Sequence, residues 1–268
     1  MDRLPRLSRE VCDLATRAGE KVMRFYQSGL AITWKKDASP LTAADSASHD
    51  FLVKSLPSLI PDAPVISEES AELNGDDIAT RRWFWLVDPL DGTKEFLKGT
   101  NEFTVNVALI EAGQPILGVV RAPALRLTYH GLRNSGSWRQ NGNDQPRAIS
   151  TRRADSGKMS VVASKDHAGP LVGTMLGRLL NPHLQSMGSS LKFCLVAEGK
   201  ADLYLRDLPT MEWDTAAAQC VVEAAGGGVY SLDGKRLGYG KAGLKNPAIV
   251  TVGDEDYGWA AVIAEPRN

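Results

Sequence analysis

The sequence predicts a mixed fold with an N-terminal α+β half and a C-terminal α/β half. In the first half, amphipathic helical periodicity over Leu7 to Gln27 is combined with alternating strand patterns such as Phe103 to Leu109. In the second half, short strand patterns alternate with helical ones, which is typical of an α/β layer. We therefore expect one unit, 1–268, made of two lobes that share a cleft, approximately 1–139 and 140–268.

The composition narrows the class of protein. The chain has 268 residues, 43% of them hydrophobic and 24% charged, which is ordinary for a globular protein. A net charge of -1 argues against a nucleic-acid polymer as partner, and no apolar run approaches the ~20 residues of an integral membrane segment. Cys12, Cys194 and Cys220 are too widely spaced for a disulfide framework or a zinc site. We expect a cytoplasmic protein, with peripheral contact to the inner membrane and the oligomeric state left open.

The elements of the first half follow from periodicity and from turn residues. The predicted helices are Leu7 to Gln27, which Gly29 ends, Thr42 to Leu56, and a single turn at Lys94 to Lys98. Polar connections are expected at 35–40 and 74–82. The predicted strands are Ile32 to Trp34, Val65 to Ile66, Trp83 to Val87, Phe103 to Leu109 as a half-buried strand, Ile116 to Val120, Arg126 to His130, and Gly136 to Trp138.

The second half begins with a polar, turn-rich stretch at 140–157. Strands are predicted at Val161 to Ala163 and Ala201 to Leu205. Helices are predicted at Leu171 to Leu180, Leu191 to Glu198 and Asp214 to Ala225, where Gly226 follows as a stop.

The stretch from Trp83 to Thr93 carries the strongest chemical signal. A buried strand is predicted to stop at Asp88, and Pro89 and the Asp91-Gly92 pair then indicate a turn. Two carboxylates three residues apart at a strand end are suited to a hard divalent cation such as magnesium. An ordinary Asp/Pro/Gly turn explains the stretch equally well when it is taken alone.

Three further acids have both an ordinary and a functional interpretation. Asp45 lies three residues after Thr42, as in a capping box, and Glu68 follows a short strand, as in a solvated turn. Asp214 precedes a run of Ala and is explained by helix capping alone. An acid at the start of a buried helix is also a ready metal ligand, beside amides that can hold an anion.

Together these motifs resemble the lithium-sensitive, magnesium-dependent phosphatases of the inositol monophosphatase superfamily. The resemblance covers nearly the whole chain: Asp45, Glu68-Glu69, Asp88-Pro-Leu-Asp-Gly-Thr93 and Trp213-Asp-Thr-Ala-Ala217 occur in the family's order. Within the superfamily, the motif sequences are most similar to those of the bacterial 3'(2'),5'-bisphosphate nucleotidases of sulfate assimilation. That similarity rests on Asp91-Gly-Thr-Lys-Glu-Phe96, Glu102-Phe-Thr-Val-Asn106, Pro115 to Val120 and Gly188-Ser-Ser-Leu-Lys-Phe-Cys-Leu-Val-Ala-Glu-Gly199.

The resemblance implies a layered αβαβα sandwich with two or three Mg²⁺ ions between the lobes. It implies that Glu68, Asp88 and the Leu90 carbonyl hold one ion, that Asp88, Asp91 and Asp214 hold a second, and that a weaker third lies near Glu68. Thr93 and Asp45 match the pair that activates water. The matching substrate-binding set is Glu68, Leu90, Asp91, Gly92, Thr93, Lys94, Gly188, Ser189, Lys192 and Asp214. Lys94, Lys192 and Arg206 are alternative cations for a second phosphate.

The implied reaction is hydrolysis of a small nucleotide bisphosphate, adenosine 3',5'-bisphosphate (PAP) or its phosphosulfate analogue (PAPS), to AMP or APS and phosphate. It would recycle the by-product of sulfate assimilation with metal-activated water and no covalent intermediate. His49, His130, His167 and His183 all lie outside the motifs. Inositol 1-phosphate and fructose 1,6-bisphosphate remain alternative substrates. Aspartyl-nucleophile phosphatases use Asp-x-Asp, whereas this chain has Asp-x-x-Asp. A non-catalytic nucleotide sensor is the remaining alternative.

Overall fold

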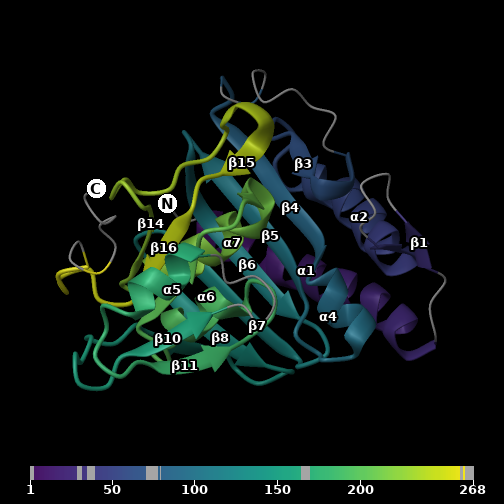
Figure 1. Cartoon of the computed structure of the whole chain (residues 1–268). Coiled ribbons are helices and arrows are strands. Elements are labelled where there is room, and N and C mark those ends of the chain that lie inside the picture. The colour runs from purple at the N-terminus through teal and green to yellow at the C-terminus, as the bar shows by residue number, and fades with distance from the viewer. Residues whose placement is uncertain are drawn as a thin grey trace.

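The chain folds into alternating helical and sheet layers (Figure 1). The computed structural model describes residues 3–28, 32–34, 40–70, 78, 80–163, 170–259 and 262. Two helices cover one face of a seven-stranded sheet, and two more separate its other face from a five-stranded sheet that carries a further helix. The predicted αβαβα fold class is confirmed.

The outer helical layer consists of α1 (Arg3–Ser28) and α2 (Ala43–Ser55). Helix α1 forms because apolar residues recur at threes and fours, and this stripe is buried against the large sheet. The stripe comprises Leu7, Val11, Ala15, Ala18 and Val22. Strands β1 (Ile32–Trp34) and β2 (Pro40–Thr42) form a small antiparallel pair between the two helices along the chain.

The large sheet has its strands in chain order and is antiparallel except where β3 runs parallel to β4. Its strands are β3 (Val65–Ser67), β4 (Trp83–Asp91), β5 (Thr104–Glu111), β6 (Gln114–Ala122), β7 (Leu127–Leu132), β8 (Gly136–Asn141) and β9 (Arg147–Ile149). The short helix α4 (Thr93–Lys98) lies between β4 and β5 along the chain.

The inner helical layer consists of α6 (Leu191–Ala197) and α7 (Ala216–Ala224), which lie in front of the large sheet in Figure 1. Helix α7 approaches β6 and β7 closely because Gly118 and Gly131 form a cross-strand pair beneath it. A Cβ on Gly118 would lie 2.2 Å from the Ala217 carbonyl oxygen, so a side chain there is excluded. This contact fixes the helix that follows Asp214.

The smaller sheet has the order β11-β10-β12-β16-β14 and is followed by helix α5 (Pro170–Leu176) as the last layer. Its strands are β10 (Ser160–Ala163), β11 (His183–Ser186), β12 (Leu203–Arg206), β14 (Gly228–Ser231) and β16 (Ile249–Val252). A separate pair joins β13 (Thr210–Met211) to β15 (Lys245–Asn246). Short 3₁₀ turns occur at Leu56–Ser58, Glu68–Ser70, Glu212–Asp214 and Ala242–Leu244.

Three predictions within these elements are wrong. Strand β4 does not stop at Asp88 but continues to Asp91, because a bulge accommodates Pro89 within the strand. Strand β5 is buried on both faces, since the inner helices cover its polar side. The helix predicted from Asp214 begins at Ala216, and Asp214 ends a preceding 3₁₀ turn.

Several strands were not predicted, and some predictions cannot be compared. Strand β9 lies within the stretch predicted to be polar and turn-rich, β11 follows a helix shorter than expected, and the strands beyond residue 227 were missed. The stop at Gly29, the loop at 35–39 and most of 74–82 lie outside the described residues, and the structure does not describe the side chain of Thr42, on which the predicted cap depends. The lobe division near residue 140 stays a prediction. Among the described residues, no helix is long and apolar enough to cross a membrane.

Candidate metal and phosphate site

The bulge in β4 brings two carboxylates to the same face of the large sheet. Asp88 pairs with Asn106 and Asp91 pairs with Thr104, so three steps along β4 match two steps along β5. Thr104 and Asn106 are two apart and share a face, and side chains that pair directly across strands lie on one side. Without the extra residue, Asp88 and Asp91 would point to opposite faces.

Asp91 is anchored through one carboxylate oxygen. Its Oδ2 accepts hydrogen bonds from Thr104 Oγ1 (3.3 Å), Asn106 Nδ2 (3.4 Å) and the backbone N–H of Ser190 (2.5 Å). Ser190 Oγ contacts Thr104 Oγ1 and donates to Asn106 Oδ1, both at 2.8 Å. These bonds use Oδ2 fully and leave Oδ1 for a further ligand.

Glu68, Asp88 and Asp214 form the carboxylate cluster of the site. Within the described part of the chain, one oxygen of each lies within 4.8 Å of the others. Burial, followed by the charges of Glu68, Asp91, Asp214 and Asp45, raises the pKa of Asp88 well above its ordinary value. Burial and the charge of Asp91 raise the pKa of Asp214 to about 8. So many buried acids repel one another unless a cation lies among them.

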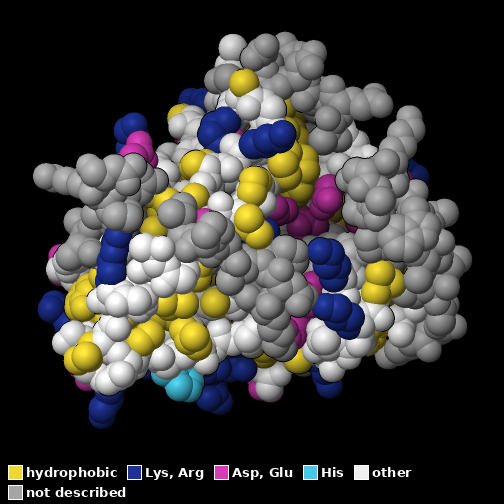
Figure 2. Space-filling model, viewed as in Figure 1, with side chains coloured by type: hydrophobic (Ala, Val, Ile, Leu, Met, Phe, Trp, Pro, Cys, Tyr) yellow, Lys and Arg dark blue, Asp and Glu magenta, His cyan; other side chains and the backbone are white. Residues whose placement is uncertain are grey.

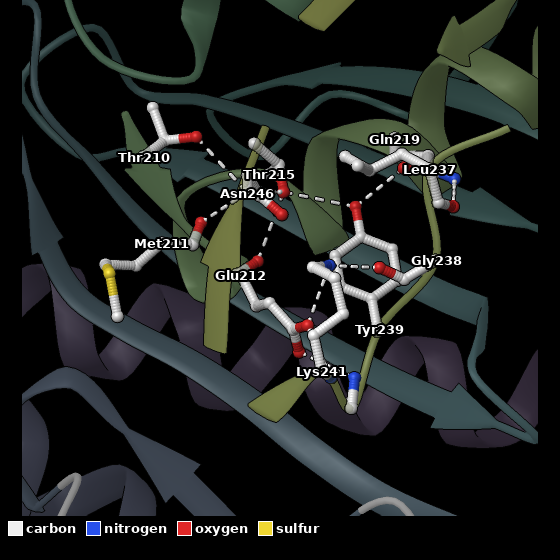
Figure 3. Close-up of polar contacts among 11 residues, drawn as sticks. Thr210, Met211, Glu212, Thr215, Gln219, Leu237, Gly238, Tyr239, Lys241 and Asn246 are labelled. Carbon is white, nitrogen blue, oxygen red and sulfur yellow. Dashed lines mark hydrogen bonds and ion pairs between the residues drawn. The ribbon is translucent and has the colours of Figure 1, made fainter. Parts of the chain in front are cut away.

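The turn that carries Asp214 is held by a buried polar network (Figure 3). Glu212 is fully buried, and its carboxylate accepts the backbone N–H groups of Gly240 (2.7 Å) and Lys241 (2.9 Å) and pairs with Lys241 Nζ (2.7 Å). Asn246 Nδ2 donates to Met211 O (2.7 Å) and to Thr215 Oγ1 (3.0 Å).

Asp214 itself is tied to this turn, because its Oδ2 accepts the N–H of Met211 at 2.8 Å. The carboxylate therefore bonds back into the turn that precedes it. Asp214 is not the N-cap of α7, which is Thr215, but it caps the 3₁₀ turn Glu212–Asp214 from the third position of that turn.

A hollow of about 60 Å³ lies beside Asp91 and Asp214 and is lined by Lys192, Tyr204 and Arg206. Lys192 is 5% exposed, and its Nζ lies 5.7 Å from the centre of the Tyr204 ring. Burial lowers the pKa of Lys192 to about 8, against the opposing charge of Asp91. Two cations thus face the acids across a small space, an arrangement suited to an anionic ligand.

The remaining predicted residues lie at the start of α4 and before α6. Gly92 has φ 87°, a left-handed conformation that favours glycine, and Thr93 Oγ1 donates to Leu90 O at 3.3 Å. Lys94 is exposed and does not line the hollow at Lys192. The N–H of Gly188 donates to Glu102 Oε2 at 2.8 Å, so it is occupied within the protein.

Buried Asp45 acts on Asp88 by charge, and Ser189, with φ 49°, lines the hollow at Lys192. On the face drawn in Figure 2, Asp and Glu side chains gather in a recess bordered by Lys and Arg side chains.

Sequence reasoning missed the residues that hold the acids of the site in place. Thr104, Asn106 and Ser190 fix Asp91, and Glu212 fixes the turn of Asp214. The sequence contains one indication, at Asn106, because a polar residue within an apolar strand pattern needs a hydrogen-bond partner when it is buried. Nothing local distinguishes Glu212 from a surface acid.

The layered fold and the carboxylate cluster of Glu68, Asp88 and Asp214 together indicate the class of protein. Residues 6–265 match the Inositol monophosphatase family. The chain belongs to this family, as its sequence motifs predicted. An inositol monophosphatase of Thermotoga maritima shares the fold, with a TM-score of 0.77 at 22% identity over 98% of this chain and 97% of that one.

Within the family, this chain is similar to proteins named 3'(2'),5'-bisphosphate nucleotidase CysQ. The Salmonella typhimurium protein is 44% identical over 86% of this chain and 92% of its own. The Haemophilus influenzae protein is 31% identical over 96% of both chains. A crystal structure of CysQ from Bacteroides thetaiotaomicron matches with a TM-score of 0.79 and 36% identity, covering 91% of this chain and 96% of that one. The predicted resemblance to these enzymes is confirmed.

Proposed function

We propose that this protein is a magnesium-dependent phosphatase that removes the 3'-phosphate of adenosine 3',5'-bisphosphate (PAP), giving AMP and phosphate. The substrate assignment is based on the 44% identity to CysQ nucleotidases over most of the chain. The acidic cluster at Glu68, Asp88 and Asp214 supports a metal requirement independently of that similarity. PAPS is the second substrate we propose, because it shares the 3'-phosphate.

The donor set fits magnesium. Hard carboxylate oxygens are the ligands that Mg²⁺ prefers. The pKa of Asp88 is raised first by burial and then by the neighbouring negative charges, which a divalent ion would neutralise. We propose Glu68, Asp88 and the Leu90 carbonyl as ligands of one ion, and Asp88, Asp91 and Asp214 as ligands of another. When bound, such ions lower the pKa of water and stabilise charge on a phosphoryl group.

The protein's own groups then orient the substrate and move a proton. The Oδ1 atom of Asp91 keeps a fixed orientation toward its proposed metal ion because Oδ2 accepts three hydrogen bonds. The Thr93 hydroxyl, near the Leu90 carbonyl, is proposed to orient the attacking water and pass its proton toward Asp45. The backbone amides of Gly92 and Thr93 are proposed to bind the 3'-phosphate group that is removed from the substrate.

Lys192 and Arg206 are proposed to hold the second phosphate of the substrate. Both line the hollow beside Asp91 and Asp214, and Lys192 is almost fully buried there. A charge-assisted hydrogen bond in such surroundings contributes about 1.5–3 kcal/mol, or roughly 10–100-fold in kcat/KM. Lys94 is exposed, and we propose that it contributes less than Lys192 and Arg206 to binding the second phosphate.

Phosphate release with magnesium tests the assignment. We expect kcat/KM for PAP to exceed that for inositol 1-phosphate and for fructose 1,6-bisphosphate by at least tenfold. Equal or reversed preference would reject the nucleotidase assignment and leave a broader metal-dependent phosphatase. A trapped phosphoenzyme would instead indicate an aspartyl nucleophile. Tight PAP binding without turnover would indicate a nucleotide sensor.

A further inference from the structure

A second hollow lies away from the acidic cluster, between α1 and the β6–β7 turn. Its volume is about 310 Å³, and none of its lining residues also lines the hollow at Lys192. Three arginines line it: Arg24 from α1, Arg121 from β6 and Arg126 from the turn. We call this hollow the arginine pocket.

Arg121 is a buried cation that forms no direct ion pair within the described part of the chain. Arg121 is only 8% exposed, and its Nη1 donates a hydrogen bond to Thr128 Oγ1 at 2.9 Å. Its Nε is buried, and no described residue accepts a hydrogen bond from it. Within the described part of the chain, Arg121 forms no ion pair with a carboxylate. A buried guanidinium that is left unpaired costs several kcal/mol.

A second guanidinium increases this cost. Burial and the charge of Arg126 both lower the pKa of Arg121. Arg126 is held close by the backbone, since its carbonyl accepts the N–H of Gly142 at 2.7 Å. Its Nη2 would lie 3.0 Å from a Cβ at Gly142, so glycine leaves the space that this guanidinium occupies. Two like charges therefore line one pocket.

Glu20 is the single acid among the lining residues, and it offsets part of this charge. Arg24 has an interaction partner of its own, and Arg121 and Arg126 against Glu20 alone still leave the pocket net positive. Thr16 and Asn143 also line it and add neutral hydrogen-bonding groups. Pockets for small molecules typically have volumes of about 300–1,000 Å³, so the space has room for an inorganic oxyanion or for a small organic molecule that carries one.

We propose that the arginine pocket binds a small oxyanion ligand, one that carries a phosphate or sulfate group, with Arg121 and Arg126 as its principal contacts. The bound anion supplies the direct ion-pair partner that Arg121 does not find among the described residues, and it separates the two guanidiniums. Arginine is suited to this because its planar fork matches phosphate oxygens in pairs. The proposal does not depend on the reaction at the acidic cluster.

Calorimetric titration of the full chain with magnesium tests this proposal, with inorganic sulfate and AMP as probes. Arg126→Gln is compared with Arg9→Gln, which removes the same charge from an exposed position on α1 outside the pocket. We expect Arg126→Gln to weaken one class of binding sites about tenfold or more, and Arg9→Gln to leave it unchanged. Tighter binding of AMP than sulfate would identify an organic phosphate, and equal binding an inorganic oxyanion.

Arg121→Met separates ligand binding from a structural role. A ligand-binding arginine that has no direct ion-pair partner should leave the ligand-free protein equally stable or more stable when replaced, while the rise of Tm with anion concentration is lost. A large loss of Tm in anion-free buffer, with the response to anion retained, would overturn the proposal. Anion affinity equal in Arg126→Gln and Arg9→Gln would also overturn it.

Discussion

The backbone N–H of Ser190 donates a 2.5 Å hydrogen bond to Asp91 Oδ2, which joins the first residue before α6 to the last residue of β4. This bond links the inner helical layer to the large sheet at the candidate metal site. Ser190 Oγ strengthens the link through Thr104 and Asn106. The position of Asp91 therefore depends on both layers.

Ser190→Ala tests this link. The substitution removes the hydroxyl partner of the buried Asn106 Oδ1, and an unsatisfied buried acceptor costs about 1–3 kcal/mol. We expect the free energy of unfolding to fall by that amount and the magnesium requirement to rise. Chemical denaturation and magnesium titration measure the two effects. Ser135→Ala, at an exposed turn, should change neither, and an unaltered Ser190→Ala protein would show that the link is dispensable.

Asp88→Asn should abolish the magnesium-dependent phosphatase activity. Asp88 stands at the centre of the acidic cluster, where Glu68, Asp91, Asp214 and Asp45 all act on it. The amide should not unfold the protein, because removing one of several crowded negative charges relieves repulsion. We therefore expect an unchanged or raised Tm in chelator together with lost activity. Undiminished turnover in excess chelator would contradict the metal assignment.

Thr93→Ala should lower kcat more than it changes KM. Assistance in proton transfer is typically worth ~10²–10⁴ in rate, and the hydroxyl is proposed to act in the reaction rather than in binding. Thr93→Ser keeps the hydroxyl and should retain most of the activity. Steady-state kinetics of both variants decide the matter, and an unchanged kcat in Thr93→Ala would leave Thr93 only the hydrogen bond to Leu90 O.

The sequence predicted the acids of this site but not what holds them. Asp88, Asp91 and Asp214 were recognised because their motifs are local, whereas the bulge between the first two depends on pairing with β5. Ser190 is distant from Asp91 in sequence and meets it only after the layers pack. Burial on both faces of β5 likewise follows from helices contributed by the second half of the chain. Local propensity carries no such information.

Glu212→Gln should weaken magnesium binding without touching a proposed ligand. The fully buried Glu212 carboxylate pairs with Lys241 Nζ and two backbone N–H groups, and it fixes the turn that ends at Asp214. Breaking a fully buried pair typically costs about 3–5 kcal/mol, and we expect a smaller loss here because the Lys241 side chain is 34% exposed. We expect a lower free energy of unfolding and a higher magnesium concentration for half-maximal activity.

A double-mutant cycle with Lys241→Met separates the pair from its surroundings. If the ion pair is the main link, Glu212→Gln combined with Lys241→Met should cost less than the sum of the single changes. Lys235→Met breaks the exposed pair with Asp233 and serves as the matched control, with little expected effect. Simple additivity of the Glu212→Gln and Lys241→Met changes would show that the backbone bonds alone hold the turn.

His130 should make the fold sensitive to mild acid. Burial lowers the pKa of His130 to about 4, and its ring stacks on Trp138 with centroids 5.1 Å apart and contacts Ser8 Oγ at 3.1 Å. In the unfolded chain the imidazole binds a proton near pH 6.5, so between about pH 6.5 and 4 the unfolded state binds more protons than the folded state. The free energy of unfolding should therefore decrease as the pH is lowered from about 6.5 to 4, by about 1–3 kcal/mol in all.

Denaturation curves at several pH values measure this slope. In His130→Gln the slope between about pH 6.5 and 4 should be shallower than in the unaltered protein, because one proton uptake linked to unfolding is gone. His183→Gln, at an exposed position of β11, should keep the full slope. The comparison must use slopes rather than absolute stabilities, since Gln also loses the stacking on Trp138. Equal slopes in His130→Gln and the unaltered protein would show that His130 accepts its proton without unfolding.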